Sequence, residues 1–172
     1  MRSLWIWGAL GLVLLIAGGA SNKTVRGWVM EPRGIRNNNP GNIRRGAKWQ
    51  GLAPEQPDSE FATFVEPVWG IRALARTLRT YAFTHGLQTV REIINRWAPP
   101  VGRDSQGRTY TQDSSAYVNH VARSLGVDPD QRLDFDAAQL QALVAAIIRH
   151  ENGKQPYSAE LISDGIQRAG WV

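Results

Sequence analysis

Residues 136–153 read DAAQLQALVAAIIRHENG, the most regular helix pattern in the chain. Its apolar side chains follow the i, i+3, i+4, i+7, i+8 spacing of the buried face of an amphipathic helix. These are Leu140, Leu143, Val144, Ile147 and Ile148. Asp136 with Gln139 opens the helix, and Asn152 with Gly153 ends it. We expect this helix to line the core of a mainly helical domain.

Glu151 occupies the next position of the same stripe. Eleven residues at the helical period bring it back to within about 20° of Leu140. A carboxyl group at the edge of a core loses hydration, which favours its protonated form. Such a group can donate a proton to the leaving oxygen of a glycoside. The other interpretation is that the helix frays at its end and the carboxylate of Glu151 reaches water.

The segments on both sides of this helix carry further helix signals. Pro67 is suited to the first turn of a helix that runs to Gly86, and Thr89 with Glu92 forms a capping box before a helix that ends at Pro99. A further helix begins after Asp113 or Ser114 and closes at Gly126, and a last one begins after Ser158.

The β structure is expected early in the chain. Residues 34–66 are rich in Gly, Asn and Pro, and the apolar residues 61–65 suit a strand, so this region is predicted to be a loop and hairpin. Residues 101–112 are polar and are predicted to be a loop. The predicted fold class is α+β, mainly α, with a small β-hairpin region.

Residues 4–20, LWIWGALGLVLLIAGGA, form an uncharged apolar segment. Seventeen residues span about 25 Å as a helix, the short limit for crossing a membrane. A permanent anchor, a cleaved signal peptide and a marginal anchor that later leaves the bilayer all fit it; it resembles the short segments of phage signal-arrest-release endolysins. All three place the rest of the protein in the periplasm. The predicted organisation is an anchor or signal segment over residues 1–22, a linker over 23–33 and one domain over 34–172.

Composition narrows the function classes. The chain has 172 residues, no cysteine and a net charge of +5. The absence of cysteine excludes disulfide scaffolds and thiolate metal sites. Positive charge favours association with a polyanion such as the bacterial cell wall. Because the arginines are scattered and no recognition motif is present, we expect no nucleic-acid partner.

Residues 145–153, AAIIRHENG, followed by Pro156, resemble the catalytic segment of lytic transglycosylases and goose-type lysozymes. In that superfamily a helix ends in a glutamate, and a small polar residue, a glycine and a proline follow. The resemblance implies a lysozyme-like fold with Glu151 as the general acid, and in a transglycosylase also as the base.

A second resemblance lies earlier in the chain. Residues 34–44, GIRNNNPGNIR, and residues 49–51, WQG, are similar to the Asn-rich loop that lines the cleft of cell-wall glucosaminidases. Residues 110–113, YTQD, resemble a tyrosine-and-aspartate motif of the same group. The substrate-binding residues implied are Asn37, Asn38, Asn39, Asn42, Trp49, Tyr110 and Tyr117. Residues 33–170 also resemble phage domains described as virion structural proteins.

The order of these motifs departs from the family. There the glutamate helix precedes the Asn-rich loop, whereas here the loop comes first. A circular permutation of the lysozyme-like domain accounts for this order. It requires Glu151 to lie close to residues 37–51 in space.

Other carboxylates are weaker candidates. Glu31 is second for the catalytic role, because in the usual order the acid precedes the Asn-rich loop. Asp58 or Glu60 would orient water in an inverting muramidase, and a transglycosylase needs no such partner. His85, His120 and His150 are at unrelated spacings, so neither a metal site nor a cofactor is expected.

The sequence therefore predicts a muramidase or lytic transglycosylase that acts on peptidoglycan, as in a phage endolysin. Residues 4–20 would hold it in the inner membrane facing the periplasm, or be lost on release. The alternative is a non-catalytic virion structural or wall-binding protein with a lysozyme-like fold. Bond specificity and oligomeric state are left open.

Overall fold

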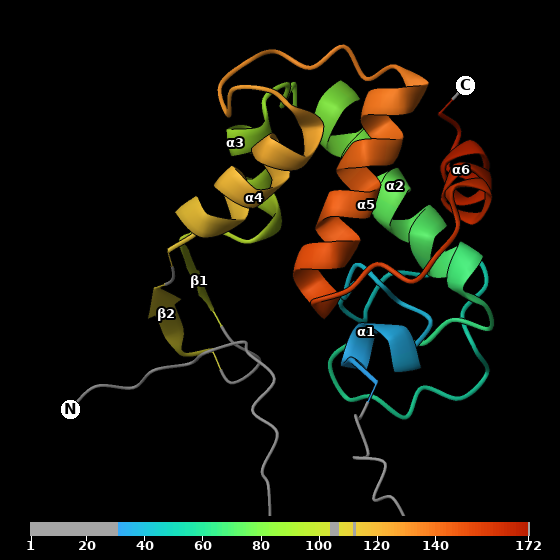
Figure 1. The fold of residues 1–172 in the computed structure, drawn as a ribbon. Coiled ribbons are helices and arrows are strands. Elements are labelled where there is room, and N and C mark those ends of the chain that lie inside the picture. The colour runs from blue at the N-terminus through green and yellow to red at the C-terminus, as the bar shows by residue number, and fades with distance from the viewer. Residues whose placement is uncertain (1–30, 104–106, 112, 172) are drawn as a thin grey trace, which may run out of the picture. The chain divides into compact units, whose positions relative to one another are not determined.

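The computed structural model describes residues 31–103, 107–111 and 113–171. The chain divides into two compact units, Met1–Glu31 and Pro32–Val172, and the second is described here (Figure 1). It contains six helices and two strands among the described residues. In chain order they are α1 (Arg33–Arg36), α2 (Pro67–Phe83), α3 (Val90–Trp97), β1 (Val101–Arg103), β2 (Thr109–Thr111), α4 (Ser115–Leu125), α5 (Ala137–Asn152) and α6 (Ala159–Arg168).

The central element is α5, which lies between α4 on one side and α2 with α6 on the other (Figure 1). The predicted cap is present, because the side chain of Asp136 accepts a hydrogen bond from the Gln139 amide. Gly153 ends the helix with φ 68°, a left-handed conformation that favours glycine. The five stripe residues are buried, as the apolar spacing predicted.

The other predicted helix signals are also confirmed. Both hydrogen bonds of the capping box form between Thr89 and Glu92 at the start of α3. Gly126 closes α4 with φ 69°, and the side chain of Ser158 caps α6. These signals succeed because each acts within one turn of helix.

The hydrophobic core has two parts. The larger is built mainly from helical side chains of α2 to α6, including Ile71, Leu78 and Ile147. A smaller cluster lies beside α2 and consists of Ile43, Ala62, Phe64 and Ala73. Trp97, at the end of α3, packs against both clusters and so connects the Asn-rich segment to the helices.

The position of the β-hairpin was predicted wrongly. The two-stranded antiparallel sheet is β1 with β2, in the segment expected to be a loop, and Gly102 pairs with Tyr110. Residues 34–66 contain only isolated bridges, Arg44 to Phe61 and Leu52 to Phe64, besides the unpredicted α1. The polar composition of residues 101–112 conceals the hairpin, because this sheet is largely outside the core and carries no apolar alternation.

The apolar segment 4–20 and most of the predicted linker 23–33 lie outside the described residues. Of the linker, residues 31–33 are described, and α1 begins at Arg33. No helix in the described part of the chain has the length and apolar character that crossing a bilayer requires.

Candidate active site around Glu151

The carboxylate of Glu151 is held at the last turn of α5, and its residue is half-buried. Three side chains from three separate segments donate hydrogen bonds to it. The amide Nδ2 of Asn42 lies 3.0 Å from Oε2, the indole Nε1 of Trp97 lies 2.9 Å from Oε1, and the Tyr117 hydroxyl lies 3.0 Å from Oε1. All three donors are uncharged, so the site is a polar cradle and not an ion pair.

The two oxygens of this carboxylate differ in what they can still accept. A carboxylate oxygen offers about two lone-pair directions. Oε1 accepts from both Trp97 and Tyr117, whereas Oε2 accepts from Asn42 alone. Within the described residues, Oε2 therefore keeps a lone-pair direction that no donor uses.

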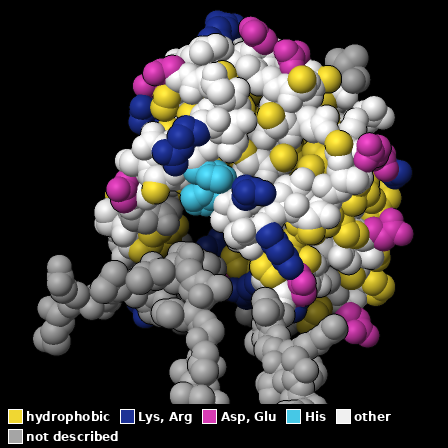
Figure 2. Space-filling view, in the orientation of Figure 1, with side chains coloured by type: hydrophobic (Ala, Val, Ile, Leu, Met, Phe, Trp, Pro, Cys, Tyr) yellow, Lys and Arg dark blue, Asp and Glu magenta, His cyan; other side chains and the backbone are white. Residues whose placement is uncertain are grey.

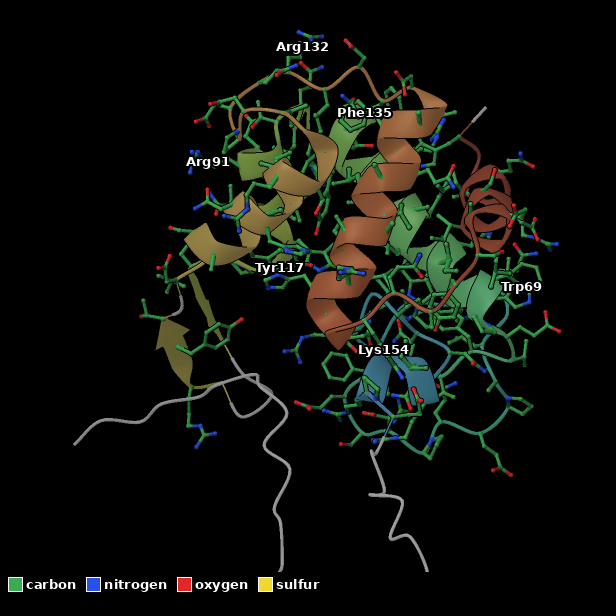
Figure 3. The ribbon with its side chains drawn as sticks, in the orientation of Figure 1. Trp69, Arg91, Tyr117, Arg132, Phe135 and Lys154 are labelled. Carbon is green, nitrogen blue, oxygen red and sulfur yellow. The ribbon has the colours of Figure 1, made fainter. Side chains whose placement is uncertain are left out.

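Tyr117 is the most buried of the three donors, with 6% of its surface exposed. Burial, followed by the charge and hydrogen bond of Glu151, holds the pKa of its phenol well above the usual value. Its ring stacks on His150 with centroids 3.6 Å apart and planes 11° apart. The pKa of His150 is lowered by burial and by His120, so this stacked ring favours its neutral form. Figure 3 labels Tyr117 beside the C-terminal half of α5, and Figure 2 shows histidine side chains at the surface in that part of the view.

The Asn-rich loop reaches Glu151 through only one of its four asparagines. Asn39 is fully buried and bonds to the backbone of Ile43 and Ala62, and Asn37 donates to Asp58. These two side chains hold the loop in shape.

Asn38 and Asn42 have positive φ values of 50° and 48°, a region that asparagine enters more readily than most residues. The Asn38 amide donates to the carbonyls of Phe64 and Val65. The conformation of Asn42 instead turns its side chain toward Glu151.

A direct contact between loop and helix fixes this arrangement. Asn152, next to the carboxylate residue, donates to the carbonyl of Pro40 at 2.7 Å and to that of Ile148 at 2.8 Å. Gly34 lies against both Asn152 and Asn42, since a Cβ at position 34 would overlap the Asn152 Oδ1 and come within 2.8 Å of the Asn42 Oδ1. Pro40 and Asn42 of the segment 37–51 thus lie beside the end of α5, which is the proximity that a circular permutation requires.

The carboxylate of Asp58 holds the loop together, and both of its oxygens accept hydrogen bonds. Arg33 donates two hydrogen bonds of 2.6 Å to its two oxygens, and the backbone amides of Glu60 and Phe61 and the side chain of Asn37 donate as well. The Arg33 guanidinium, helped by these amides, holds the pKa of Asp58 far below its usual range. Glu60 also contacts Arg33, at 2.9 Å.

The remaining predicted residues lie in different surroundings. Trp49 packs against the smaller cluster, and its indole nitrogen is buried without a hydrogen-bond partner. Tyr110 lies in β2, with its phenol over Gly102. Glu31 is exposed and belongs to the first unit of the chain.

Trp97 is the contributor to the site that the sequence did not reveal. It continues the apolar spacing of Val90, Ile93 and Ile94 on its helix, a pattern that by itself indicates packing. An indole N–H that is withdrawn from water needs an acceptor, but the identity of that acceptor depends on a residue 54 positions away.

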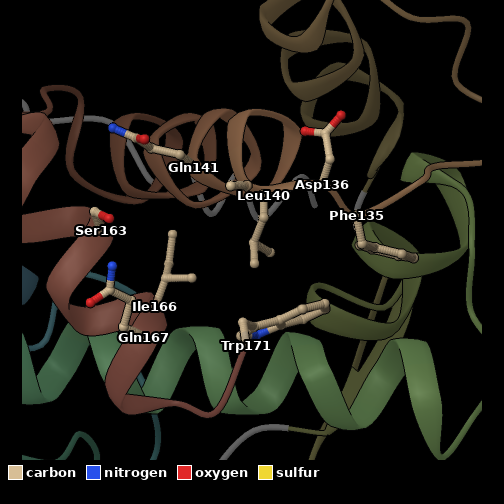
Figure 4. A pocket seen from close by; sticks show the side chains of 9 residues that line it. Phe135, Asp136, Leu140, Gln141, Ser163, Ile166, Gln167 and Trp171 are labelled. Atoms are coloured by element: carbon tan, nitrogen blue, oxygen red, sulfur yellow. The ribbon is translucent and has the colours of Figure 1, made fainter.

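Two other features of the described residues bear on ligands. No group of three His, Cys, Asp or Glu side chains in them is placed to hold a metal ion. A pocket of about 250 Å³ lies at the opposite end of α5, between Leu140, Ile166 and Trp171 (Figure 4). It shares no lining residue with the Glu151 site.

The fold and the site together define a mainly helical protein with a small antiparallel sheet and one half-buried carboxylate held by neutral donors. No family model matches the chain. It is 40% identical over 139 residues to Protein P5 of Pseudoalteromonas phage PM2, an alignment that covers 78% of this chain and 80% of that protein. The chain belongs to the same family as this phage protein.

Proposed function

We propose that this protein cleaves the glycan strands of bacterial peptidoglycan, as a muramidase or lytic transglycosylase, with Glu151 as the general acid. The observation that carries the proposal is the cradle of Asn42, Trp97 and Tyr117 around one carboxylate at the end of a core helix. Three donors from distant segments hold this one carboxylate in a fixed orientation, which is what a general acid requires.

In the proposed reaction Glu151 gives the proton on Oε2 to the glycosidic oxygen. Oε1 keeps its bonds to Trp97 and Tyr117, which stabilise the carboxylate that forms. After it has given up its proton, Glu151 is a carboxylate, and it can then accept the proton of the attacking hydroxyl group.

The state of Asp58 favours attack by the sugar's own 6-hydroxyl group, as in lytic transglycosylases. An inverting muramidase requires a second carboxylate that activates water. Asp58 is bound by Arg33 and three other donors and has a strongly lowered pKa, so it is a poor base. The other candidate, Glu60, is paired with the same Arg33 at 2.9 Å. This favours the transglycosylase reaction within the proposal.

The proposed setting is host lysis by a phage endolysin. Membership in a phage family supports this setting. Residues 4–20 would anchor the chain in the inner membrane or export it, and would place the domain in the periplasm beside its substrate. The net charge of +5 favours contact with the anionic wall.

The alternative function is a non-catalytic virion structural or wall-binding protein. One observation favours it, because hydrogen bonds on both carboxylate oxygens can also serve to lock α5 to the loop and to α3 and α4. In that case Glu151 would be a structural clamp and no bond would be cut.

The test is degradation of purified peptidoglycan by the whole chain and by Glu151→Gln, with products identified by mass. Gln keeps the size of the side chain but cannot donate the acidic proton. Glu55→Gln is the matched control, since Glu55 is exposed. We expect the wild type and Glu55→Gln to release anhydro-ended fragments and Glu151→Gln to lose at least about a thousandfold in rate.

Products with reducing ends would still support glycan cleavage by this protein, but by hydrolysis and not by the transglycosylase reaction. Equal rates in the wild type and in Glu151→Gln would transfer the acid role elsewhere, first to Glu31. If all three folded proteins leave peptidoglycan intact, the non-catalytic alternative takes the place of the enzyme.

A further inference from the structure

One face of α2 carries three arginines followed by an exposed phenylalanine. Arg72, Arg76, Arg79 and Phe83 are spaced i, i+4, i+7 and i+11, so they form a single stripe about 16 Å long. We call these four residues the α2 stripe. Phe83 is 66% exposed, one of the few large apolar side chains in the described residues with so much surface in water.

The arginines of the α2 stripe are held in place by the C-terminal end of α6. Arg72 Nε donates to the carbonyl of Arg168, Arg76 Nη1 to that of Ala169 and Arg79 Nε to that of Gly170, at 3.1 to 3.2 Å. These carbonyls lie at a helix end, where backbone acceptors need partners. Capping α6 is therefore one role of the three arginines.

Capping of α6 uses only a small part of the hydrogen-bond donors of these three arginines. A guanidinium has five N–H donors, and each arginine gives one of them to a carbonyl. Arg72 and Arg79 bond through Nε, which leaves both terminal nitrogens available to an external acceptor. Burial, followed by the neighbouring positive charge of Arg76, lowers the pKa of Arg72.

No carboxylate neutralises the stripe within the described part of the chain. Asp164 on α6 is paired with Arg168 at 2.7 Å. The stripe therefore presents a row of positive charge with pre-positioned N–H forks, a geometry suited to phosphate oxygens. A fixed donor loses little side-chain entropy when it binds.

Phe83 decides which kind of polyanion fits. Its ring is supported by Trp171, at 5.3 Å between centroids, and the Arg79 guanidinium lies 5.3 Å above it. An exposed aromatic ring beside arginines gains free energy at a bilayer interface, where its apolar face leaves water while the cations remain among the headgroups. A DNA duplex offers the same phosphates, but its base faces are covered by stacking, so it gives the Phe83 ring no apolar layer to enter.

We propose that the α2 stripe is a docking surface for an anionic phospholipid bilayer, with the arginines on headgroup phosphates and Phe83 in the interface. This contact is distinct from the one expected of residues 4–20. It is also independent of the chemistry at Glu151, because the hydrogen bonds and ring contacts of the stripe go to α6 and Trp171.

The test measures co-sedimentation of the whole chain with phosphatidylcholine vesicles that contain rising fractions of phosphatidylglycerol. Joint replacement Arg72→Gln, Arg76→Gln and Arg79→Gln should lower partitioning onto vesicles rich in phosphatidylglycerol by roughly a hundredfold, at about fivefold per arginine. Binding to pure phosphatidylcholine should not change, since residues 4–20 are intact. The corresponding Lys variant keeps the charge but loses the N–H forks, so its partitioning should fall between the wild type and the Gln variant.

A charge-matched control removes three exposed arginines from other parts of the chain, Arg45, Arg123 and Arg132, by the same change to Gln. It should bind vesicles much better than the stripe variant, and equal losses would show that only net charge matters and overturn the proposal. If the triple stripe variant does not fold, the single variants Arg76→Gln and Phe83→Ser take its place in the vesicle assay, because both side chains are exposed. Wild-type binding by both would overturn the proposal.

A site-specific readout uses the absence of cysteine from the chain. An environment-sensitive dye on Phe83→Cys should brighten on anionic vesicles, whereas the same dye on Ser124→Cys should not. Unchanged fluorescence at position 83 would overturn the docking surface. So would a stripe variant that loses affinity for duplex DNA but keeps its affinity for vesicles, which would assign the stripe to nucleic acid. Peptidoglycan cleavage, measured in parallel, reports separately on the proposed function.

Discussion

The indole Nε1 of Trp97 donates a 2.9 Å hydrogen bond to Oε1 of Glu151, across 54 residues of sequence. Trp97 also packs against both hydrophobic clusters. The same side chain thus joins the two parts of the core and orients the candidate acid. A change in how the clusters pack would therefore move a donor of the site.

Replacement of Trp97 by Phe keeps a ring but removes the donor. A hydrogen bond to a charged group contributes about 1.5–3 kcal/mol, so we expect peptidoglycan cleavage to fall at least about tenfold. The assay is fragment release from purified peptidoglycan, together with thermal unfolding. Trp69→Phe is the control, since Trp69 packs on Gly51 and under Arg168. A full rate for Trp97→Phe would limit Trp97 to packing.

Tyr117 should make the protein sensitive to alkali. Its pKa in the folded state is raised above the value near 10 of an unfolded chain, so the folded state holds its proton more tightly. This stability is fully present below about pH 10 and is lost as pH rises through the folded pKa. Urea unfolding at pH 8 and at pH 10.5 should show a smaller alkaline loss for Tyr117→Phe. The expectation fails if both proteins lose the same amount.

Gly34→Ala should separate the loop from α5. The new Cβ would overlap the Asn152 Oδ1 and crowd the Asn42 Oδ1. Overpacking of this kind costs about 1–3 kcal/mol, and we also expect reduced cleavage because Asn42 would shift from Glu151. Gly41→Ala is the comparison, because its Cβ would approach the Leu74 side chain to 3.2 Å, a tight contact but one without the overlap at Gly34. Chemical denaturation should rank Gly34→Ala as the less stable protein, and the reverse order would refute this account.

Asp58→Asn should destabilise the protein at neutral pH and remove part of its acid sensitivity. The mutation leaves Arg33 without its main partner, and we expect a loss of about 2–3 kcal/mol, below the range for fully buried pairs because Arg33 is partly exposed. The pKa of Asp58 is depressed in the folded state, so its contribution is present above about pH 4 and disappears as pH falls through the folded pKa. Urea midpoints at pH 7 and pH 3 should differ less for Asp58→Asn than for the wild type. An equal change of the urea midpoint in the two proteins would show that the Arg33–Asp58 pair is not a source of stability.

Five of the six helices in the described residues, and the position of Glu151 on α5, could be predicted from local sequence signals. The capping box at Thr89, the cap at Asp136 and the glycine end at Gly153 could be predicted, because each depends on groups within about one turn. The apolar stripe places Glu151 at the core edge for the same local reason. The hairpin at β1 and β2 and the short α1 were missed, because neither carries an apolar period of its own.

The side chains that surround Glu151 could not be predicted, because they come from segments far apart in the chain. Asn42, Trp97 and Tyr117 lie 109, 54 and 34 residues from it in sequence, and packing of the two clusters brings them together. Tertiary structure also separated Asn42, which reaches the carboxylate, from Asn39, which is buried in its own loop. Such choices depend on the relative positions of whole elements, which long-range burial sets and local spacing does not.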